Sequence, residues 1–218
     1  MIKVCVVGGK GNMGRRYLAI LDHLGVESVS VDRGDRIPEK ITHYIVATPT
    51  SLHGHTLGRI PRNEDNPVPI LCEKPIMVTN NMAALHGIEF LRKNGRKIYM
   101  VNQYAYYFDK MPQKSGITCY DYYNSGGDGV AWDCIQIIHL ARGEITTLAN
   151  KSPVWRCVIN GIELRRDMID LCYIKMIRDF ISDGLEYGRL WGWDDIKASH
   201  EKVIRINSDF DRCSGQIR

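Results

Sequence analysis

The stretch that decides the fold is Ile2-Lys-Val-Cys-Val-Val7, followed at once by Gly8-Gly-Lys-Gly-Asn-Met-Gly14. The first part is a short apolar run with β-branched residues, which is typical of a buried strand. Residues 15–24 carry apolar side chains at helical spacing, and Gly25 stops that pattern. The glycine cluster is therefore predicted to form a tight turn between a strand and a helix.

The same alternation continues outward from this unit. Short apolar runs predict further strands at residues 26–31, 44–47, 70–72 and 98–101. Asn80 is a candidate N-cap for a helix through residues 82–94, and Gly95 is its stop signal. Strands that alternate with helices indicate an α/β fold, and we expect a Rossmann doubly wound parallel sheet over residues 1–105.

The pattern changes in the second half of the chain. Residues 117–123 read as a strand, 130–141 as a helix, and Asn160-Gly161 as the turn of a β-hairpin. Residues 168–182 and 194–207 have helical patterns. We expect a small α+β domain over residues 106–218 with a mainly antiparallel sheet, whose last helix can pack back on the Rossmann domain.

Composition narrows the classes of function. The 218 residues carry a net charge of +4 without a Lys/Arg run, which argues against a nucleic-acid partner. The seven cysteines form no Cys-x-x-Cys pair, so neither a disulfide framework nor a metal site is indicated. The sequence contains no secretory signal and no apolar span of 18 residues, so we expect a cytoplasmic protein without a membrane partner.

The glycine cluster contains the spacing Gly9-x-Gly11-x-x-Gly14. In a dinucleotide-binding turn the first glycine permits the tight turn, the second lets the backbone approach the pyrophosphate, and the third lets helix and strand pack closely. The second predicted strand ends at Asp32, where a carboxylate can hold the adenine ribose. We therefore predict a nicotinamide dinucleotide; the alternative is a glycine-rich turn that binds nothing.

Two neighbouring residues bear on which dinucleotide binds. Asp32 favours NAD, whereas Arg33 can stack on adenine or accept the 2′-phosphate of NADP. The cofactor is thus predicted to be NAD or NADP, with NAD ahead. Arg15 and Arg16 add positive charge near the expected pyrophosphate, unless they simply form a solvated helix surface.

Two more motifs follow predicted strands at the same sheet edge: Ala-Thr-Pro-Thr-Ser-Leu-His at 47–53 and Glu-Lys-Pro at 73–75. Together with the glycine loop and Met13, they make the sequence resemble the Gfo/Idh/MocA family of NAD(P)-dependent oxidoreductases, which includes glucose–fructose oxidoreductase and inositol dehydrogenase. The resemblance covers the first domain. It continues more loosely through residues 126–133 and the helix around Asp179, in what looks like a short member with a reduced C-terminal domain.

The resemblance implies roles for these residues. Lys74 would lie near the nicotinamide and the reacting hydroxyl, and Pro75 is often cis in relatives. The alternatives are a solvent-exposed lysine and, for His53, a capping or surface histidine. The cofactor-binding residues that we predict are Gly9, Gly11, Asn12, Met13, Gly14, Asp32, Arg33, Thr48, Pro49, Thr50, His53, Glu73, Lys74 and Pro75.

The sequence departs from the family in its second half. The family places a His four residues after an Asp on one helix; here Asp133 matches the Asp, but residue 137 is Ile. Lys74 would then have to take the hydroxyl proton alone or with a tyrosine such as Tyr104. We predict that Lys74, Asp133 and Tyr104 are catalytic. The alternatives are structural roles: a helix cap or a salt bridge for Asp133, and packing for Tyr104.

Three functions follow from these observations. The first is an NAD(P)-dependent oxidoreductase acting on a secondary alcohol or ketone of a sugar, cyclitol or similar polyol. The second is a dinucleotide-binding sensor or regulatory protein with weak or no dehydrogenase activity. The third is a reductase of another unsaturated substrate, as in biliverdin reductases. We also expect a homodimer through an apolar face of the C-terminal sheet, formed by Tyr120, Tyr122, Trp155, Val158 and Ile162.

Overall fold

The computed structural model describes residues 1–62, 67–108, 118–121, 135–136, 145–149, 158–159, 162–163, 166–182, 190 and 192–214. Its centre is a sheet of five parallel strands in the order β2-β1-β3-β4-β5. The strands are β1 (Lys3–Val7), β2 (Glu27–Val31), β3 (His43–Val46), β4 (Pro69–Cys72) and β5 (Lys97–Met100). The predicted α/β doubly wound sheet is confirmed.

The strands end at one level, because their last residues are paired with one another. Val7 pairs with both Val31 and Val46, and Cys72 pairs with Val46 and Met100. The residues that follow the strands therefore meet at one edge of the sheet. The strand order runs from β1 to β2 on one side and from β3 to β5 on the other, so it reverses between β1 and β3. Ligands bind at such a reversal point in open α/β sheets.

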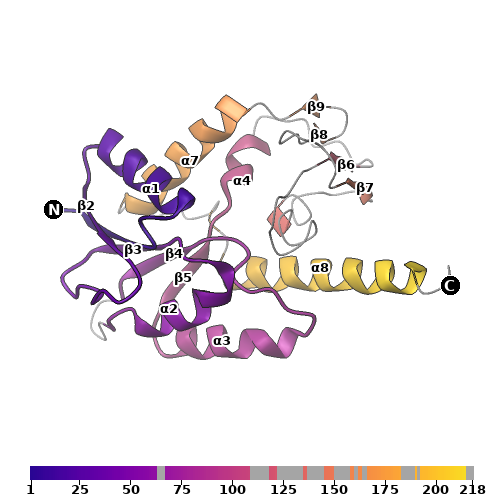
Figure 1. Cartoon of the computed structure of the whole chain (residues 1–218), viewed down its shortest axis with the longest axis horizontal. Coiled ribbons are helices and arrows are strands. Elements are labelled where there is room, and N and C mark those ends of the chain that lie inside the picture. Colours follow the sequence, from indigo (N-terminus) through magenta and orange to yellow (C-terminus); the bar gives the residue numbers. More distant parts are fainter. Residues whose placement is uncertain are drawn as a thin grey trace.

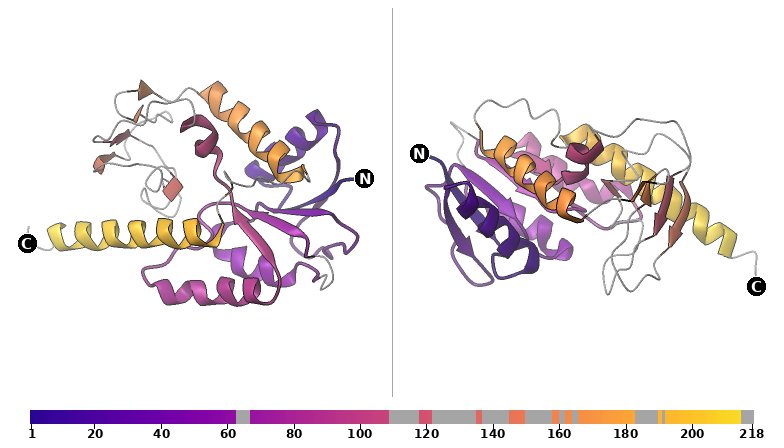
Figure 2. Two further views of the ribbon diagram at one scale, coloured as in Figure 1. Left: turned by 180° about the vertical axis from the view of Figure 1, so that it is seen from behind. Right: turned by 90° about the horizontal axis from the view of Figure 1, so that it is seen from above.

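Helices cover both faces of the sheet (Figure 1, Figure 2). One face carries α1 (Asn12–His23) and α7 (Arg166–Ile181), and the other carries α2 (His53–Arg59) and α3 (His86–Lys93). The strand side chains of β1 and β3 are almost all buried. Parallel sheets are covered by helices on both faces, so both sides of each strand must be apolar. This explains why β1 and β3 are continuous apolar runs.

The helix expected after Asn80 begins differently from the prediction. Asn81, and not Asn80, is its N-cap: the Asn81 side-chain oxygen accepts a hydrogen bond of 2.9 Å from the Ala83 N–H. The helix starts as a 3₁₀ turn, η2 (Met82–Leu85), before continuing as α3. Two adjacent asparagines offer the same cap, and only the backbone direction selects between them.

The second half contains α4 (Gln103–Phe108), β6 (Thr118–Asp121), β7 (Ile145–Ala149), β8 (Val158–Ile159) and β9 (Ile162–Glu163). Strands β8 and β9 are antiparallel, in agreement with the expected hairpin, although Asn160 and Gly161 lie outside the described residues. Strands β6 and β7 pair in parallel, so the expected mainly antiparallel sheet is not what the described strands show. Parallel pairing needs a long crossover, and residues 122–144 provide that length.

The last helix, α8 (Trp193–Ser214), starts against the Rossmann part and then extends beyond it (Figure 1). The Arg92 guanidinium lies 5.3 Å from the centre of the Trp193 ring, and His200 Nε2 lies 3.1 Å from the Met77 carbonyl oxygen. Both long C-terminal helices therefore contact the first part of the chain. The division of the chain at residue 105 stays a prediction.

None of the helices in the described part of the chain is long and apolar enough to cross a membrane. No group of three or more His, Cys, Asp or Glu side chains within these ranges is arranged to hold a metal ion.

The close contact between α1 and the end of β1 leads to a first prediction. A Cβ atom at Gly14 would lie 2.1 Å from the Gly8 carbonyl oxygen, so Gly14→Ala must push the helix away from the strand. We expect the free energy of unfolding to fall by about 3 kcal/mol or more in denaturant titrations. Gly58→Ala is the matched control: nothing lies within 4 Å of its added Cβ, and alanine at this position of α2 should raise stability by up to about 1 kcal/mol. Equal effects of the two substitutions would contradict this account.

Candidate dinucleotide site

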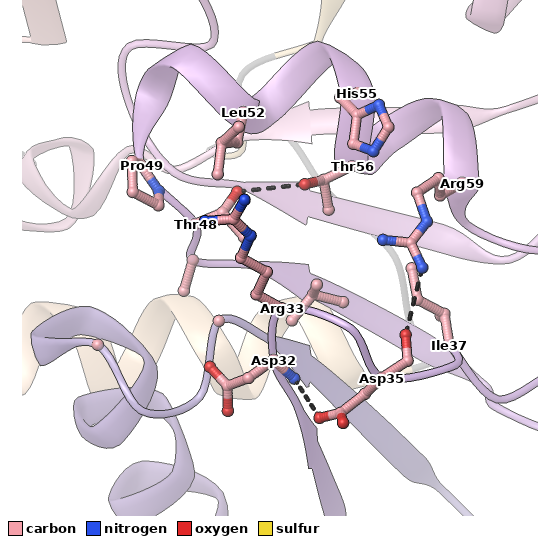
Figure 3. Close-up of a pocket in the computed structure, with 14 residues that line it drawn as sticks. Asp32, Arg33, Asp35, Ile37, Thr48, Pro49, Leu52, His55, Thr56 and Arg59 are labelled. Atoms are coloured by element: carbon pink, nitrogen blue, oxygen red, sulfur yellow. Dashed lines mark hydrogen bonds between the residues drawn. The ribbon is translucent and has the colours of Figure 1, made fainter.

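A cavity of about 440 Å³ lies at the carboxyl ends of β1, β2 and β3 (Figure 3). It sits at the point where the connections reverse, as expected for an α/β sheet. Of the predicted cofactor residues, five line it. The described residues that line it are Val7, Gly8, Gly11, Asp32, Arg33, Asp35, Ile37, Ala47, Thr48, Pro49, Leu52, His55, Thr56 and Arg59.

The glycine loop has no room for side chains where it meets the sheet. Gly8 has a φ of +91°, and a Cβ there would lie 2.9 Å from the Ala47 carbonyl. A Cβ at Gly9 would lie 1.9 Å from the Ser30 hydroxyl oxygen on β2. The chain can therefore turn sharply from β1 into α1 only because these positions lack side chains.

The N-terminus of α1 opens beside this loop and is suited to an anion. The helix begins at Asn12 with Gly11 as N-cap, no side chain caps it, and its first turn contains no acidic residue. Met13 and Gly14 also belong to this turn. The backbone N–H groups and the positive end of the helix dipole could therefore hold a phosphate. Arg15 stays at the same end, donating 2.7 Å to the Lys10 carbonyl oxygen.

Asp32 and Arg33 both line the cavity but point in different directions (Figure 3). The Asp32 carboxylate accepts a 3.3 Å hydrogen bond from the Lys10 N–H in the glycine loop. The Asp32 N–H in turn donates to the Asp35 carboxylate at 2.7 Å. The end of β2 is thus joined to the glycine turn, and Arg33 is exposed at the mouth of the cavity.

Sequence reasoning missed one wall of the cavity. Leu52, His55, Thr56 and Arg59 line it from η1 (Thr50–Leu52) and α2. Thr56 lies 3.4 Å from the hydroxyl of Thr48, and Arg59 donates to the Asp35 carbonyl oxygen at 3.2 Å. The signal that could have found them was their helical spacing, because positions three to four apart share one helix face. Thr50 itself does not line the cavity.

His53 links two loops and does not line this cavity. It is 1% exposed, with Nε2 2.9 Å from the Thr48 carbonyl oxygen and Nδ1 3.0 Å from that of Pro75. Burial lowers the pKa of the imidazole, and the surrounding carbonyls and the Glu73 carboxylate oppose that shift. The ring therefore fixes the segment after β3 to the segment after β4.

The Glu-Lys-Pro segment follows β4 beside this histidine. Glu73 is 7% exposed: one carboxylate oxygen accepts from the hydroxyl of Tyr17, and the other accepts from the Lys74 N–H at 3.0 Å. The Lys74–Pro75 peptide bond is cis, as the resemblance implies. The Lys74 side chain is half-buried. These three residues do not line the cavity that holds Asp32 and Arg33.

Of the two other predicted catalytic residues, Tyr104 is among the residues that the structure describes and Asp133 is not. Tyr104 is buried in the first turn of α4, directly beyond β5, which pairs with β4. The hydroxyl of its neighbour Tyr106 donates a 2.8 Å hydrogen bond to the Asp179 carboxylate on α7. Asp133 and position 137 lie outside the described residues, so the Asp133 role stays a prediction.

Arg16 was expected near the pyrophosphate, and the structure places it elsewhere. Its guanidinium lies 5.0 Å from the centre of the Tyr173 ring and 3.2 Å from the Asp170 carboxylate, both on α7. The residue next to it, Arg15, is the one that remains at the helix start. Successive helix positions point about 100° apart, which separates the two arginines.

Two buried histidines give a pH dependence of stability. Burial lowers the pKa values of His53 and His200 below 6.5, so the unfolded chain binds their protons first as the pH falls. We expect the free energy of unfolding to drop between pH 7 and 5, by up to about 1.4 kcal/mol per pH unit for each histidine. In denaturant titrations across this range, His53→Asn should flatten the dependence, whereas the exposed His55→Asn should keep it. The same slope in both variants would contradict the prediction.

No model of a known protein family matches the chain, and no curated protein sequence matches it. A WlbA (WbpB) dehydrogenase from Thermus thermophilus, solved with NAD and α-ketoglutarate, is similar in structure: 14% identity, 94% of each chain covered and a TM-score of 0.64. A myo-inositol dehydrogenase from Lactobacillus casei, solved with NAD(H) and myo-inositol, has 12% identity, covers 97% of this chain and 95% of its own, and has a TM-score of 0.61.

A biliverdin reductase from Synechocystis, solved with biliverdin and NADP+, also matches, at 11% identity, 94% coverage of this chain, 96% of its own and a TM-score of 0.52. At such identities the likeness is one of fold. The structures that share it include dehydrogenases solved with NAD, so the fold that the resemblance implies is confirmed.

Proposed function

We propose that this protein is an NAD(P)-dependent oxidoreductase that acts on a secondary alcohol or ketone of a sugar, cyclitol or similar polyol. The observation that carries the proposal is the cavity at the strand ends, with the glycine loop on one side and Asp32 and Arg33 on the other. Lys74 follows the neighbouring strand β4 at the same sheet edge. The dehydrogenases that share the fold support this reading.

The residues of the site fit a dinucleotide. The positions that would contact its phosphates are glycines at which a Cβ would collide with backbone or with Ser30, and the uncapped start of α1 supplies N–H donors. The cavity beside Asp32 and Arg33 suits the adenosine half. When bound, the nicotinamide exchanges a hydride with the substrate carbon.

Lys74 is the residue we assign to the substrate hydroxyl. Its ammonium can donate a hydrogen bond to the oxygen of a substrate alcohol and stabilise the negative charge that develops there, and as a neutral amine the same group can accept the hydroxyl proton. Glu73 accepts hydrogen bonds from Tyr17 and from the Lys74 N–H, so we assign it the role of fixing this segment. Tyr104 and Asp133 remain our candidates for assisting proton transfer.

The cofactor preference rests on two side chains. The Asp32 carboxylate, at the end of β2, favours the ribose hydroxyls of NAD. Arg33 and Arg59 on the cavity wall can accept the 2′-phosphate of NADP. We keep NAD ahead because the carboxylate would repel that phosphate.

Two alternatives each rest on one observation. Position 137 is Ile where the family carries His, which favours a dinucleotide-binding sensor or regulatory protein. The similarity to a biliverdin reductase favours a reductase of a different substrate. A cytoplasmic location and a homodimer through the C-terminal sheet remain proposals; the side chains expected to form that dimer face lie outside the described ones.

Cofactor binding is measurable without knowing the substrate. Titrating NADH and NADPH while following nicotinamide fluorescence should show saturable binding by the wild type. Asp32→Ala should weaken NADH binding about tenfold and favour NADPH, whereas Arg33→Ala should weaken NADPH more than NADH. Lys93→Ala, on the exposed end of α3, is the control and should leave both affinities unchanged. Wild type that binds neither nucleotide would refute the proposal.

Turnover distinguishes the oxidoreductase from the sensor. With NAD or NADP and a panel of polyols and sugars, the wild type should reduce the nucleotide, and Lys74→Ala should lower kcat at least about a hundredfold. Lys93→Ala again serves as the control. Nucleotide binding without turnover of any panel member would instead support the sensor.

A further inference from the structure

The hydroxyl of Tyr17 is buried beside the Glu-Lys-Pro segment, and the proposed reaction has no direct use for it. This side chain is fully buried on α1, and its hydroxyl donates to the Glu73 carboxylate. We propose that Tyr17 is a positioning residue: by holding the Glu73 carboxylate in one orientation, it fixes the backbone of Lys74 and hence the direction of the lysine side chain. The inference rests on the proposed function for its catalytic meaning, but not for its structural content.

Among the residues that the structure describes, the Glu73 carboxylate has one protein donor for each oxygen. Tyr17 serves Oε1, and the Lys74 N–H serves Oε2 at 3.0 Å. A carboxylate that is 7% exposed depends on such donors, because water cannot replace them fully. Without the Tyr17 hydroxyl, the Lys74 N–H is the one donor to the carboxylate that remains within the described part of the chain, so the orientation of Glu73 is less restricted.

Tyr17 is suited to be a permanent donor. Burial, followed by the nearby carboxylate of Glu73, raises the pKa of its hydroxyl well above its ordinary value. The proton therefore stays on the phenol at all physiological pH values. An ionised carboxylate can only accept, so the direction of this hydrogen bond is fixed.

Side chains of helix α7 contact Tyr17 and its neighbour Arg16 on α1. The ring of Tyr173 meets that of Tyr17 edge-on at 6.1 Å, and Arg16 lies 5.0 Å above the Tyr173 ring while pairing with Asp170 at 3.2 Å. These contacts connect a helix from the second half of the chain to the segment that carries Lys74. They leave the Tyr17 ring little freedom to turn.

The test compares Tyr17→Phe with Tyr44→Phe in the full-length protein. Each substitution removes one buried tyrosine hydroxyl, but that of Tyr44 donates to the Pro38 carbonyl oxygen, away from the Glu-Lys-Pro segment. The first readout is the rate of acetylation of Lys74 by acetic anhydride, measured by peptide mass spectrometry relative to the exposed Lys40. Tyr17→Phe should change the Lys74 rate at least about threefold, as loss of a hydrogen bond to a charged group would; Tyr44→Phe should leave it unchanged.

The second readout is kinetic, on the panel member that the wild type oxidises fastest. Tyr17→Phe should lower kcat about tenfold with KM within about twofold, because a misdirected lysine acts on the reaction and not on binding. Tyr44→Phe should retain the wild-type kcat.

The outcomes separate the two proposals. An altered Lys74 rate in Tyr17→Phe alone, in a protein that turns over no panel member, supports the positioning role and counts against the proposed function. A Lys74 rate that is unchanged in Tyr17→Phe overturns the positioning role, whatever the activity. Acetylation that rises at all lysines together shows loss of the fold and also overturns it.

Discussion

The backbone contact between Gly14 of α1 and Gly8–Gly9 at the end of β1 is the constraint on which the remaining structure depends. Any Cβ at Gly14 would penetrate the Gly8 carbonyl, so the helix can start directly behind the strand only with hydrogen at that position. This close approach directs the N-terminus of α1 toward the sheet edge. The cavity lies beyond the ends of β1, β2 and β3, beside this turn.

Polar groups then hold the strand-end segments together in an otherwise apolar setting. His53 bridges the segments after β3 and β4 through backbone carbonyls, and Glu73 joins α1 to the Glu-Lys-Pro turn. Buried polar groups of this kind specify one arrangement, because any other leaves a donor or acceptor without a partner. The site is thereby organised by residues that do not themselves line the cavity.

Most of the first hundred residues could be read from the sequence because local signals suffice there. The glycine spacing, the short apolar runs and the polar residues at their ends predicted the strands and the location of the site. The cap at Asn81, the 3₁₀ start of the following helix and the parallel pairing of β6 with β7 escaped prediction. In each case several local choices are equivalent, and contacts distant in sequence decide among them.

The sequence by itself determined that a strand, a glycine turn and a helix come first, and that Asp32, Thr48 and Lys74 follow successive strands. Those features depend on residue type and spacing, which act over a few residues. Only the tertiary structure decided that Arg16 turns to α7, that the face of α2 with Thr56 and Arg59 lines the cavity, and that Tyr17 meets Glu73 across 56 positions of sequence. Such contacts form because helices must bury their faces against a particular neighbour, and the neighbour is set by the whole packing of the chain.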